Sequence, residues 1–265
     1  AFGGGGARGF THLGAIKAFE EFGIKFDFVA GTSAGSLVGA FYACGYTYKQ
    51  MYDIVKTIKE KDIRKNLIPF TPSKLDGLSE IIIKNLGDIN IEDTKIPFAA
   101  VAVDIKSTKE VCLAKGNLTK AVLGSCAVPG VFQPIIYEDM ILCDGGLQNT
   151  IPADMPRYFG CDYVISVDVN KSRTYGTEST KMLDVLSCSI RILMKSNAVR
   201  GYVNSDLVIA PETKRFKSTK TDGMEEMIEE GYKATIDAMP KIMEIFRKKK
   251  KHKIKNLPTD IKFIR

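Results

Sequence analysis

The sequence predicts an α/β fold with a mostly parallel central sheet and helices on both faces. Short apolar, β-prone segments alternate along the chain with longer segments of helical pattern, as in that fold class. The length of 265 residues and the hydrophobic content of 45% suffice to bury one large core. We therefore expect one domain over residues 1–246, followed by a basic tail over residues 247–265.

The first expected elements follow one another closely. A helix is expected over residues 10–22, closed by Gly23, then a strand over 26–30 and a helix over 36–44. Further helices are expected over residues 48–61, 78–86, 184–194 and 225–246. Further strands are expected over residues 98–104, 111–113, 140–143, 162–169 and 207–210.

The turn between the strand at 26–30 and the helix at 36–44 has the sequence Gly31-Thr32-Ser33-Ala34-Gly35. A Gly-x-Ser-x-Gly pattern between a strand and a helix is typical of a nucleophile elbow, because Gly31 and Gly35 allow a sharp turn that exposes the serine hydroxyl. The alternative is a tight turn in which Ser33 only caps the helix.

A glycine-rich loop, Gly3-Gly4-Gly5-Gly6-Ala7-Arg8-Gly9, precedes the first helix. Free backbone N–H groups at a helix N-terminus can bind a phosphate or the oxyanion of an acyl-transfer intermediate. The loop also matches the dinucleotide fingerprint Gly-x-Gly-x-x-Gly. That fingerprint needs an acidic residue about 20 positions further on, at the end of the second strand. Here the strand continues into Gly31-Thr32-Ser33, which favours the oxyanion interpretation.

A general base for Ser33 has to be a carboxylate if the protein is a hydrolase. The chain has two histidines. His12 precedes the serine, and His252 lies within the basic tail, which is a poor place to bury an imidazole, so a conventional serine–acid–histidine triad is disfavoured. Asp144 ends an apolar run and is followed by Gly145 and Gly146, which places a carboxyl at a sheet edge. The alternative for Asp144 is an ordinary Asp-Gly hairpin turn.

These motifs resemble those of the patatin-like phospholipases. The resemblance rests on the glycine-rich loop, on Gly31-Thr32-Ser33-Ala34-Gly35 and on Asp144-Gly145-Gly146, and covers roughly the first 160 residues. Residues 125–132 and 149–152 are similar to the same family. One departure is that only Ala1 and Phe2 precede the glycines, so most of the first strand of that fold is not in this sequence.

The resemblance implies a role for each matching residue. Ser33 would be the nucleophile, Asp144 the base, and the N–H groups of Gly4, Gly5 and Gly6 the oxyanion hole. Arg8 and Gly9 would support that hole, although the alternative for Arg8 is an exposed residue at a helix start. The implied activity is hydrolysis of lipid acyl esters through an acyl-enzyme, with no metal or cofactor.

Two other functions remain as alternatives. The same acyl-enzyme could transfer its acyl group to an alcohol, which would make the protein a transacylase. Acyltransferases of the related fold use a histidine directly before the nucleophile, and Thr32 occupies that position here. The second alternative is a dinucleotide-binding protein.

The net charge of +7 is concentrated at one end of the chain. Residues 247–265 contain nine Lys or Arg and one Asp, a net charge of +8. We expect such a segment either to be solvated or to bind peripherally to an anionic membrane surface. Nucleic-acid binding is disfavoured because few aromatic residues are interleaved with these charges. The sequence leaves the oligomeric state open.

The cysteines indicate a reducing compartment. The six cysteines show no Cys-x-x-Cys spacing, and several lie in apolar runs, so we expect free core thiols and a cytoplasmic location. No run of eighteen apolar residues occurs, and the start does not have the pattern of a signal peptide.

Overall fold

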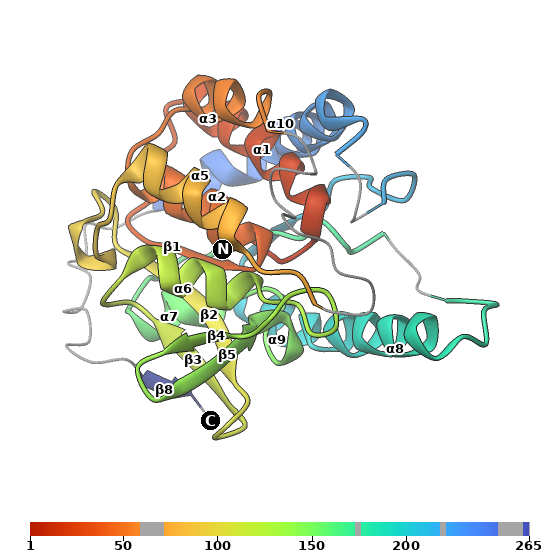
Figure 1. Ribbon diagram of the computed structural model, residues 1–265. Helices are drawn as coiled ribbons and strands as arrows, with labels where there is room; N and C mark the ends of the chain where they lie inside the picture. The colour runs from red at the N-terminus through yellow and green to blue at the C-terminus, as the bar shows by residue number, and fades with distance from the viewer. Residues whose placement is uncertain (59–71, 173–175, 218–220, 249–261, 265) are drawn as a thin grey trace.

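The computed structural model describes residues 1–58, 72–172, 176–217, 221–248 and 262–264 (Figure 1). The end of the helix expected at 48–61 and most of the expected basic tail lie outside these residues. The described strands are β1 (Val29–Thr32), β2 (Phe98–Asp104), β3 (Lys109–Leu113), β4 (Ile135–Tyr137), β5 (Met140–Asp144), β6 (Ile165–Val167), β7 (Leu207–Ile209) and β8 (Lys262–Ile264).

The described helices alternate with these strands, as the sequence predicts for an α/β fold. They are α1 (Phe10–Glu21), α2 (Ala34–Ala43), α3 (Tyr48–Val55), α5 (Asp76–Leu86), α6 (Leu118–Cys126), α7 (Asp154–Tyr158), α8 (Met182–Ser196), α9 (Ala198–Asn204) and α10 (Met224–Lys248). Short 3-10 turns cover η1 (Gly6–Gly9), η2 (Ile91–Asp93) and η3 (Gly145–Leu147).

Helix ends follow local capping chemistry. Gly23 adopts φ +65 after α1, and Ile24 N–H donates back to Phe19 O at 2.8 Å, which confirms the predicted glycine stop. The side chain of Asn117 caps α6 by accepting from Lys120 N–H at 2.9 Å.

The α/β class is confirmed, but the sheet is mixed rather than mostly parallel. Within the described residues a six-stranded sheet has the order β4-β5-β2-β3-β8, with β1 also paired to β2, and β6 and β7 form a second pair. The pairs β1–β2 and β6–β7 are parallel. The pairs β2–β3, β2–β5, β4–β5 and β3–β8 are antiparallel. Short turns join β2 to β3 and β4 to β5, so these two pairs are hairpins and are antiparallel by construction. The pairs β2–β5 and β3–β8 join strands that are distant in the sequence.

The first residues of the chain join the two groups of strands. Phe2 forms parallel bridges to Gly31 of β1 and to Val167 of β6. Its N–H donates to Ala30 O at 2.8 Å, and Gly3 N–H donates to Val167 O at 3.0 Å. This short segment therefore occupies the strand position next to β1 and leads directly into the glycine-rich loop.

Strand β2 forms the centre of the core because both of its faces are covered. Ala100 and Ala102 belong to the larger cluster of buried side chains, which includes residues of α1, α2, α6 and α10. Ala99 and Val101 point to the opposite face and belong to a cluster with Met155 of α7. Helices α1, α3 and α10 lie together on one side of the sheet, and α7 and α9 lie away from them (Figure 1).

The topology places the ends of β1 and β5 side by side. Both strands pair with the same edge of β2, β1 in parallel and β5 in antiparallel orientation, so they approach each other from opposite directions. Thr32 at the end of β1 is opposite Val101, and Asp144 at the end of β5 is opposite Ala102. The residues that follow the two strands therefore meet at one point of the sheet.

Two described parts of residues 247–265 belong to regular elements. Helix α10 continues to Lys248, and β8 pairs antiparallel with β3 at the sheet edge. No described helix is both long and apolar enough to cross a membrane.

Candidate active site

Ser33 lies at the sharp turn between β1 and α2 with φ 54 and ψ −128, a conformation that L-residues rarely adopt. Gly35 is required there, because a Cβ on it would lie 2.1 Å from Phe2 O. A Cβ on Gly31 would lie 2.4 Å from Gly35 O. Both glycines thus occupy the positions predicted for an elbow.

Hydrogen bonds fix the backbone of Ser33 and leave its hydroxyl free of a capping role. Ser33 N–H donates to Ser125 Oγ at 2.9 Å, and Ser125 Oγ–H donates to Val101 O at 2.6 Å. Ser36 Oγ–H donates to Ser33 O at 2.7 Å. The Ser33 side chain makes no capping hydrogen bond to α2, so the capping alternative does not describe this turn.

Asp144 is fully buried at the end of β5. Its Oδ1 accepts from Gly146 N–H at 2.8 Å, and η3 follows it rather than a hairpin. Its Oδ2 accepts no well-formed hydrogen bond from any described residue. Burial raises the pKa of Asp144 to about 6, while the nearby Ser33 hydroxyl and the Gly146 N–H partly offset this rise. The structure therefore brings the predicted serine and carboxyl together.

The glycine-rich loop lies against Ser33. A Cβ on Gly4 would lie 3.2 Å from Ser33 Cβ. The Gly4 N–H already donates to Thr150 O at 3.0 Å, so this amide is engaged within the fold. No described residue accepts from the N–H groups of Gly5 and Gly6, and Gly6 has φ +60. Of the three predicted donors, Gly5 and Gly6 are the ones available to a ligand.

Arg8 is buried and is not the exposed residue of the alternative interpretation. Its Nη2 donates to Asn170 Oδ1 at 2.6 Å, and Asn170 Nδ2 donates to Gly4 O at 2.6 Å. Gly9 allows close packing against the elbow, because a Cβ there would lie 2.7 Å from Ala34 Cβ. Arg8 therefore holds the loop through Asn170, a residue that the sequence analysis missed.

A chain of hydrogen bonds continues from Asn170 to α9. Asn170 N–H donates to Asp168 Oδ1 at 2.8 Å, and Tyr202 Oη–H donates to Asp168 Oδ2 at 2.6 Å. His12 supports the other end of the glycine-rich loop, where its Nε2 donates to Gly3 O at 2.8 Å. Burial lowers the pKa of His12 to about 4, so the ring is neutral near pH 7 and is occupied in holding the loop.

A second polar network lies behind Thr32. Thr32 Oγ1–H donates to Asn149 O at 2.8 Å. Asn149 Nδ2 donates to Glu110 Oε1 at 2.9 Å and to Asp154 Oδ1 at 2.8 Å. Arg200 Nη2 of α9 contacts both carboxylates. Burial raises the pKa of Glu110 against the opposing effect of these hydrogen bonds. The network joins the elbow to α9.

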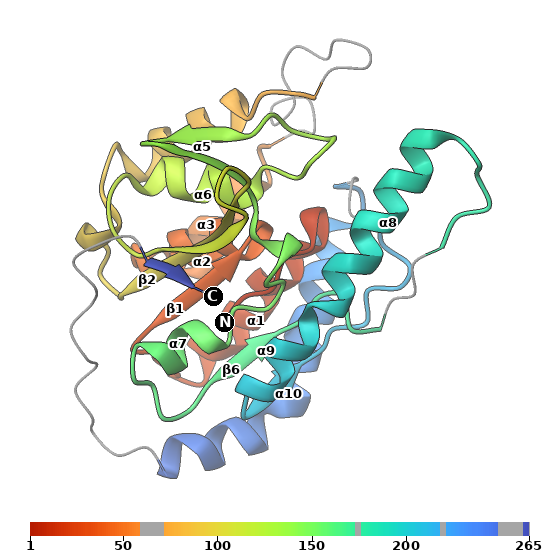
Figure 2. The same ribbon diagram turned by 90° about the horizontal axis from the view of Figure 1, so that it is seen from below.

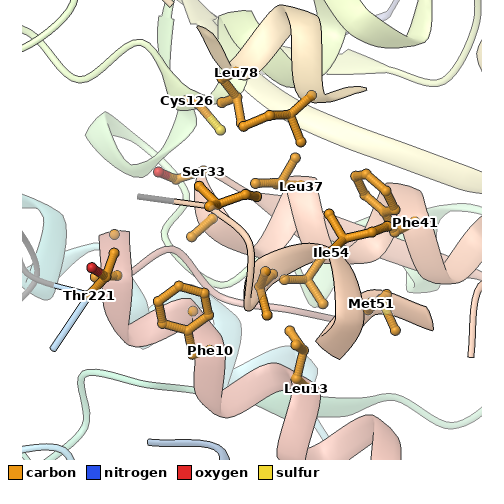
Figure 3. Close-up of a pocket in the computed structure, with 18 of the residues that line it drawn as sticks. Phe10, Leu13, Ser33, Leu37, Phe41, Met51, Ile54, Leu78, Cys126 and Thr221 are labelled. Carbon is orange, nitrogen blue, oxygen red and sulfur yellow. The ribbon is translucent and has the colours of Figure 1, made fainter. Parts of the chain in front are cut away.

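An apolar cavity of about 230 Å³ opens beside Ser33. Side chains of α1, α2, α3 and α5 enclose it, and Figure 3 shows Ser33 next to Cys126, with Leu37, Phe41 and Met51 extending away from the serine. Burial, and then the charge of Asp144, raises the pKa of the Cys126 thiol, so this sulfur is a packing group rather than a nucleophile. The cavity fits an acyl chain better than a polar ligand.

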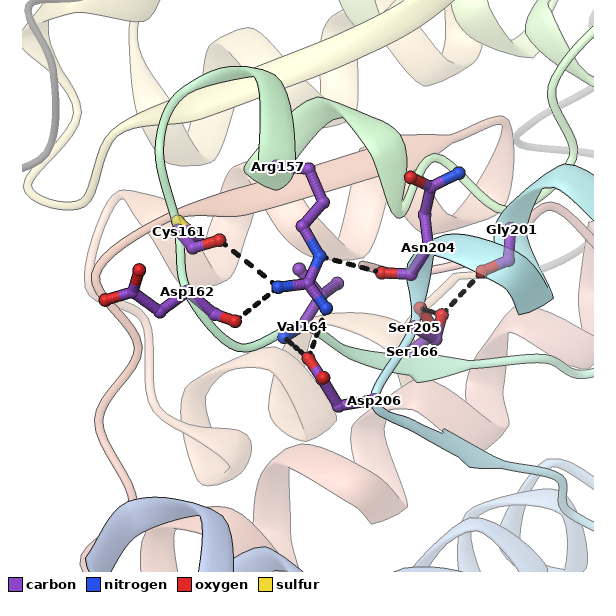
Figure 4. Close-up of polar contacts among 9 residues, drawn as sticks. All are labelled: Arg157, Cys161, Asp162, Val164, Ser166, Gly201, Asn204, Ser205 and Asp206. Carbon is purple, nitrogen blue, oxygen red and sulfur yellow. Dashed lines mark hydrogen bonds and ion pairs between the residues drawn. The ribbon is translucent and has the colours of Figure 1, made fainter. Parts of the chain in front are cut away.

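A separate cluster around Arg157 has a structural role. The guanidinium donates to Asn204 O at 3.1 Å and to the Asp206 carboxylate at 2.5 Å (Figure 4). It also donates to the main-chain carbonyls of Cys161 and Asp162. These bonds fasten α7 and the following loop to the segment between α9 and β7.

The fold and the site together define an α/β protein with a strand–serine–helix elbow beside an apolar cavity. A model of the family described as "Patatin-like phospholipase" matches residues 1–157, and the chain belongs to this family.

Curated relatives share the same part of the chain. An uncharacterized NTE family protein of Mycobacterium bovis is 32% identical over 180 residues, which cover 65% of this chain and 49% of that protein. The lysophospholipase nte1 of Aspergillus fumigatus is 32% identical over 188 residues, covering 66% of this chain and 12% of that protein. The chain thus spans about half of the mycobacterial relative and a small part of the fungal one.

A solved structure shares the fold. VipD from Legionella pneumophila matches with a TM-score of 0.61 and 14% sequence identity, covering 91% of this chain and 66% of that one. The structural match extends well beyond residue 157. It therefore supports the patatin-like α/β fold for most of the chain.

Proposed function

We propose that the protein is a lipid acyl hydrolase in which Ser33 and Asp144 form a catalytic dyad. Ser33 Oγ attacks the ester carbonyl carbon while Asp144 Oδ2 takes the hydroxyl proton. The negative charge that develops on the carbonyl oxygen is stabilised by the N–H groups of Gly5 and Gly6. Collapse of this intermediate breaks the ester C–O bond, and the leaving alkoxide receives the proton from Asp144.

The second half-reaction releases the fatty acid. Asp144 accepts a proton from water, the resulting hydroxide attacks the acyl-enzyme carbonyl, and Ser33 Oγ leaves with the proton. If an alcohol replaced water, the product would be a new ester, so product analysis distinguishes hydrolysis from transacylation. The apolar cavity beside Ser33 is the proposed site of the acyl chain.

The observation that carries this proposal is the meeting of β1 and β5 on adjacent residues of β2. This meeting supports the dyad because the strained Ser33 lies beside a buried carboxyl that has one oxygen without a well-formed hydrogen bond. Hydrogen bonds in free active sites often tighten only when the substrate binds. A dinucleotide would need an acidic residue at the end of β1, where Thr32 and Ser33 lie instead.

The names of the fungal relatives suggest the first substrates to test. Several are named lysophospholipases, so a lysophospholipid is the natural starting point, although the chain spans only a small part of those proteins. The basic segment 247–265 is proposed to add attraction to anionic lipid surfaces, and this effect should weaken as salt concentration rises.

Hydrolysis of lysophosphatidylcholine and of p-nitrophenyl butyrate by variants tests the proposal. Ser33→Ala and Asp144→Asn should each lower kcat/KM by at least ~10²-fold, because each removes a group that acts in the transition state. His12→Gln should lower hydrolysis far less than either dyad variant, since the ring is assigned no proton transfer and only holds Gly3 O in the glycine-rich loop. Unchanged hydrolysis in Ser33→Ala, with the melting temperature preserved, would refute the dyad.

A further inference from the structure

Helix α8 exposes an apolar face that the proposed chemistry does not use. Met182 is 71% exposed and Leu193 is 57% exposed, and Val185, Leu186 and Ile192 are exposed as well. At 3.6 residues per turn these five side chains fall within an arc of roughly 120° on one side of the helix. Both views show α8 projecting from the body (Figures 1 and 2).

One flank of this apolar face carries a net positive charge, with Asp184 on the same side of the helix as Arg191 and Lys195. Arg191 and Lys195 lie one turn apart on α8, Lys181 directly precedes the helix, and Asp184 is the one acidic residue of the helix. An amphipathic helix with an exposed apolar face and basic residues beside it has the character of a segment that lies in a membrane interface. The net positive charge of this flank complements the anionic headgroups of such an interface.

The carboxyl end of α8 is bonded to the candidate active site. Thr150 Oγ1–H donates to Met194 O at this end of the helix. The next residue after α8, Asn197, donates through Nδ2 to Leu147 O at 2.6 Å in η3, directly after Asp144. Thr150 O in turn accepts from Gly4 N–H in the glycine-rich loop. These hydrogen bonds therefore link α8 both to the glycine-rich loop and to the segment that directly follows Asp144. A membrane surface that binds α8 would be connected to the candidate active site through them.

We infer that the exposed face of α8 docks onto an anionic lipid surface and presents that surface to the site at Ser33. The inference rests on the proposed lipid hydrolysis, and it assigns the docking to α8 rather than to the basic segment alone. Apolar side chains would enter the interface, and Lys181, Arg191 and Lys195 would remain at headgroup level.

The 265-residue chain contains no tryptophan, which allows a direct test by fluorescence. Leu186→Trp introduces a single tryptophan on the α8 face, and Ile105→Trp introduces one at a similarly exposed apolar position in the β2–β3 turn. Phosphatidylcholine vesicles containing phosphatidylserine should shift the emission of Leu186→Trp to the blue, and the shift should shrink at high salt. Ile105→Trp should not shift. Equal shifts at both positions, or none at Leu186→Trp, would overturn the inference.

A second pair of variants separates docking from catalysis. Leu186→Asp with Leu193→Asp should lower vesicle binding and hydrolysis of vesicle lipids by at least tenfold, and leave hydrolysis of monomeric p-nitrophenyl butyrate within about twofold. Ser33→Ala should bind vesicles like the wild type. If Ser33→Ala still hydrolyses esters, the proposed function is wrong, and vesicle binding through α8 is judged separately by the aspartate variant. If the aspartate variant binds vesicles normally, or instead converts a dimer to a monomer in sedimentation, docking to lipid is wrong.

Discussion

At Ser33, the positive φ is held by the surrounding hydrogen bonds and not by the residue's own preference. A non-glycine residue in such a conformation costs of order 1–3 kcal/mol, and it persists only where the neighbouring structure fixes it. Ser125 and Ser36 bond the main chain of Ser33 on both sides, which supplies that constraint. At Asp144 the perturbed property is the pKa, which is raised by burial of the carboxyl and not by backbone strain.

The raised pKa of Asp144 gives a pH dependence with a definite sign. The carboxyl must be ionised to accept a proton, so kcat/KM for a soluble ester should rise with pH through about 6 and be level above it. The pKa of His12, near 4, places its titration below this rise. The check is a pH–rate profile, and a profile without a transition, or with one near 4, would contradict the assignment.

The raised pKa of Asp144 makes stability fall with increasing pH, whereas activity should rise. The folded state favours protonated Asp144, so the stability that this carboxyl contributes is fully present below its unfolded pKa of about 3.9 and is lost as pH rises through about 6. Asp144→Asn should remove this part of the pH dependence of unfolding. The active protonation state is thus the less stable one.

Asn170 is expected to act as a positioning residue for the glycine-rich loop. Asn170→Ala removes the bridge between Arg8 and Gly4 O and should lower kcat by ~10–100-fold with little change in KM, because the oxyanion exists only in the transition state. Steady-state kinetics with a soluble ester measure the effects on kcat and on KM separately. Asn204→Ala on α9 is the control and should change neither constant. A rise in KM alone for Asn170→Ala would assign Asn170 to substrate binding.

At the scale of elements, the elbow depends on the close approach of α2 to the first residues of the chain. Gly35→Ala places a methyl group against main-chain atoms of Phe2 that cannot move independently, so we expect a loss of more than ~2 kcal/mol of unfolding free energy. Gly176→Ala is the matched control, since a Cβ there meets nothing within 4 Å, and its effect should stay within about 0.5 kcal/mol. Urea unfolding compares the two, and equal stabilities would contradict the packing described for the elbow.

Elements with strong local patterns were predicted well from sequence, and short or edge elements were not. The strand at residues 98–104 is confirmed with the same bounds, because its apolar run is buried on both faces and ends at polar turns. Helices α6, α7 and α9 and strands β4 and β8 were missed. β4 and β8 have three residues each and lie at the edges of the sheet. Their formation depends on partners distant in sequence, which local propensity does not contain.

For the whole molecule, the sequence identified the pieces of the site but not the geometry that unites them. The roles of Ser33, Asp144 and the glycine-rich loop remain predictions, and the structure places all three side by side. The sheet expected to be mostly parallel is mixed, because a short turn makes β2 and β3 a hairpin and the direction of β5 follows from long-range topology. Asn170 was missed because it follows an ordinary buried strand and carries no motif. The cavity was missed because helices distant from one another in the sequence enclose it.

Reaction of the full chain with a fluorophosphonate, followed by peptide mapping, tests the central claim most directly. Such a reagent modifies a serine whose oxygen is activated by a base and whose adduct is held by an oxyanion hole. We expect one adduct, at Ser33, and we expect it to form much more slowly in Asp144→Asn. An adduct at another serine, or equal labelling rates with and without the Asp144 carboxylate, would contradict it.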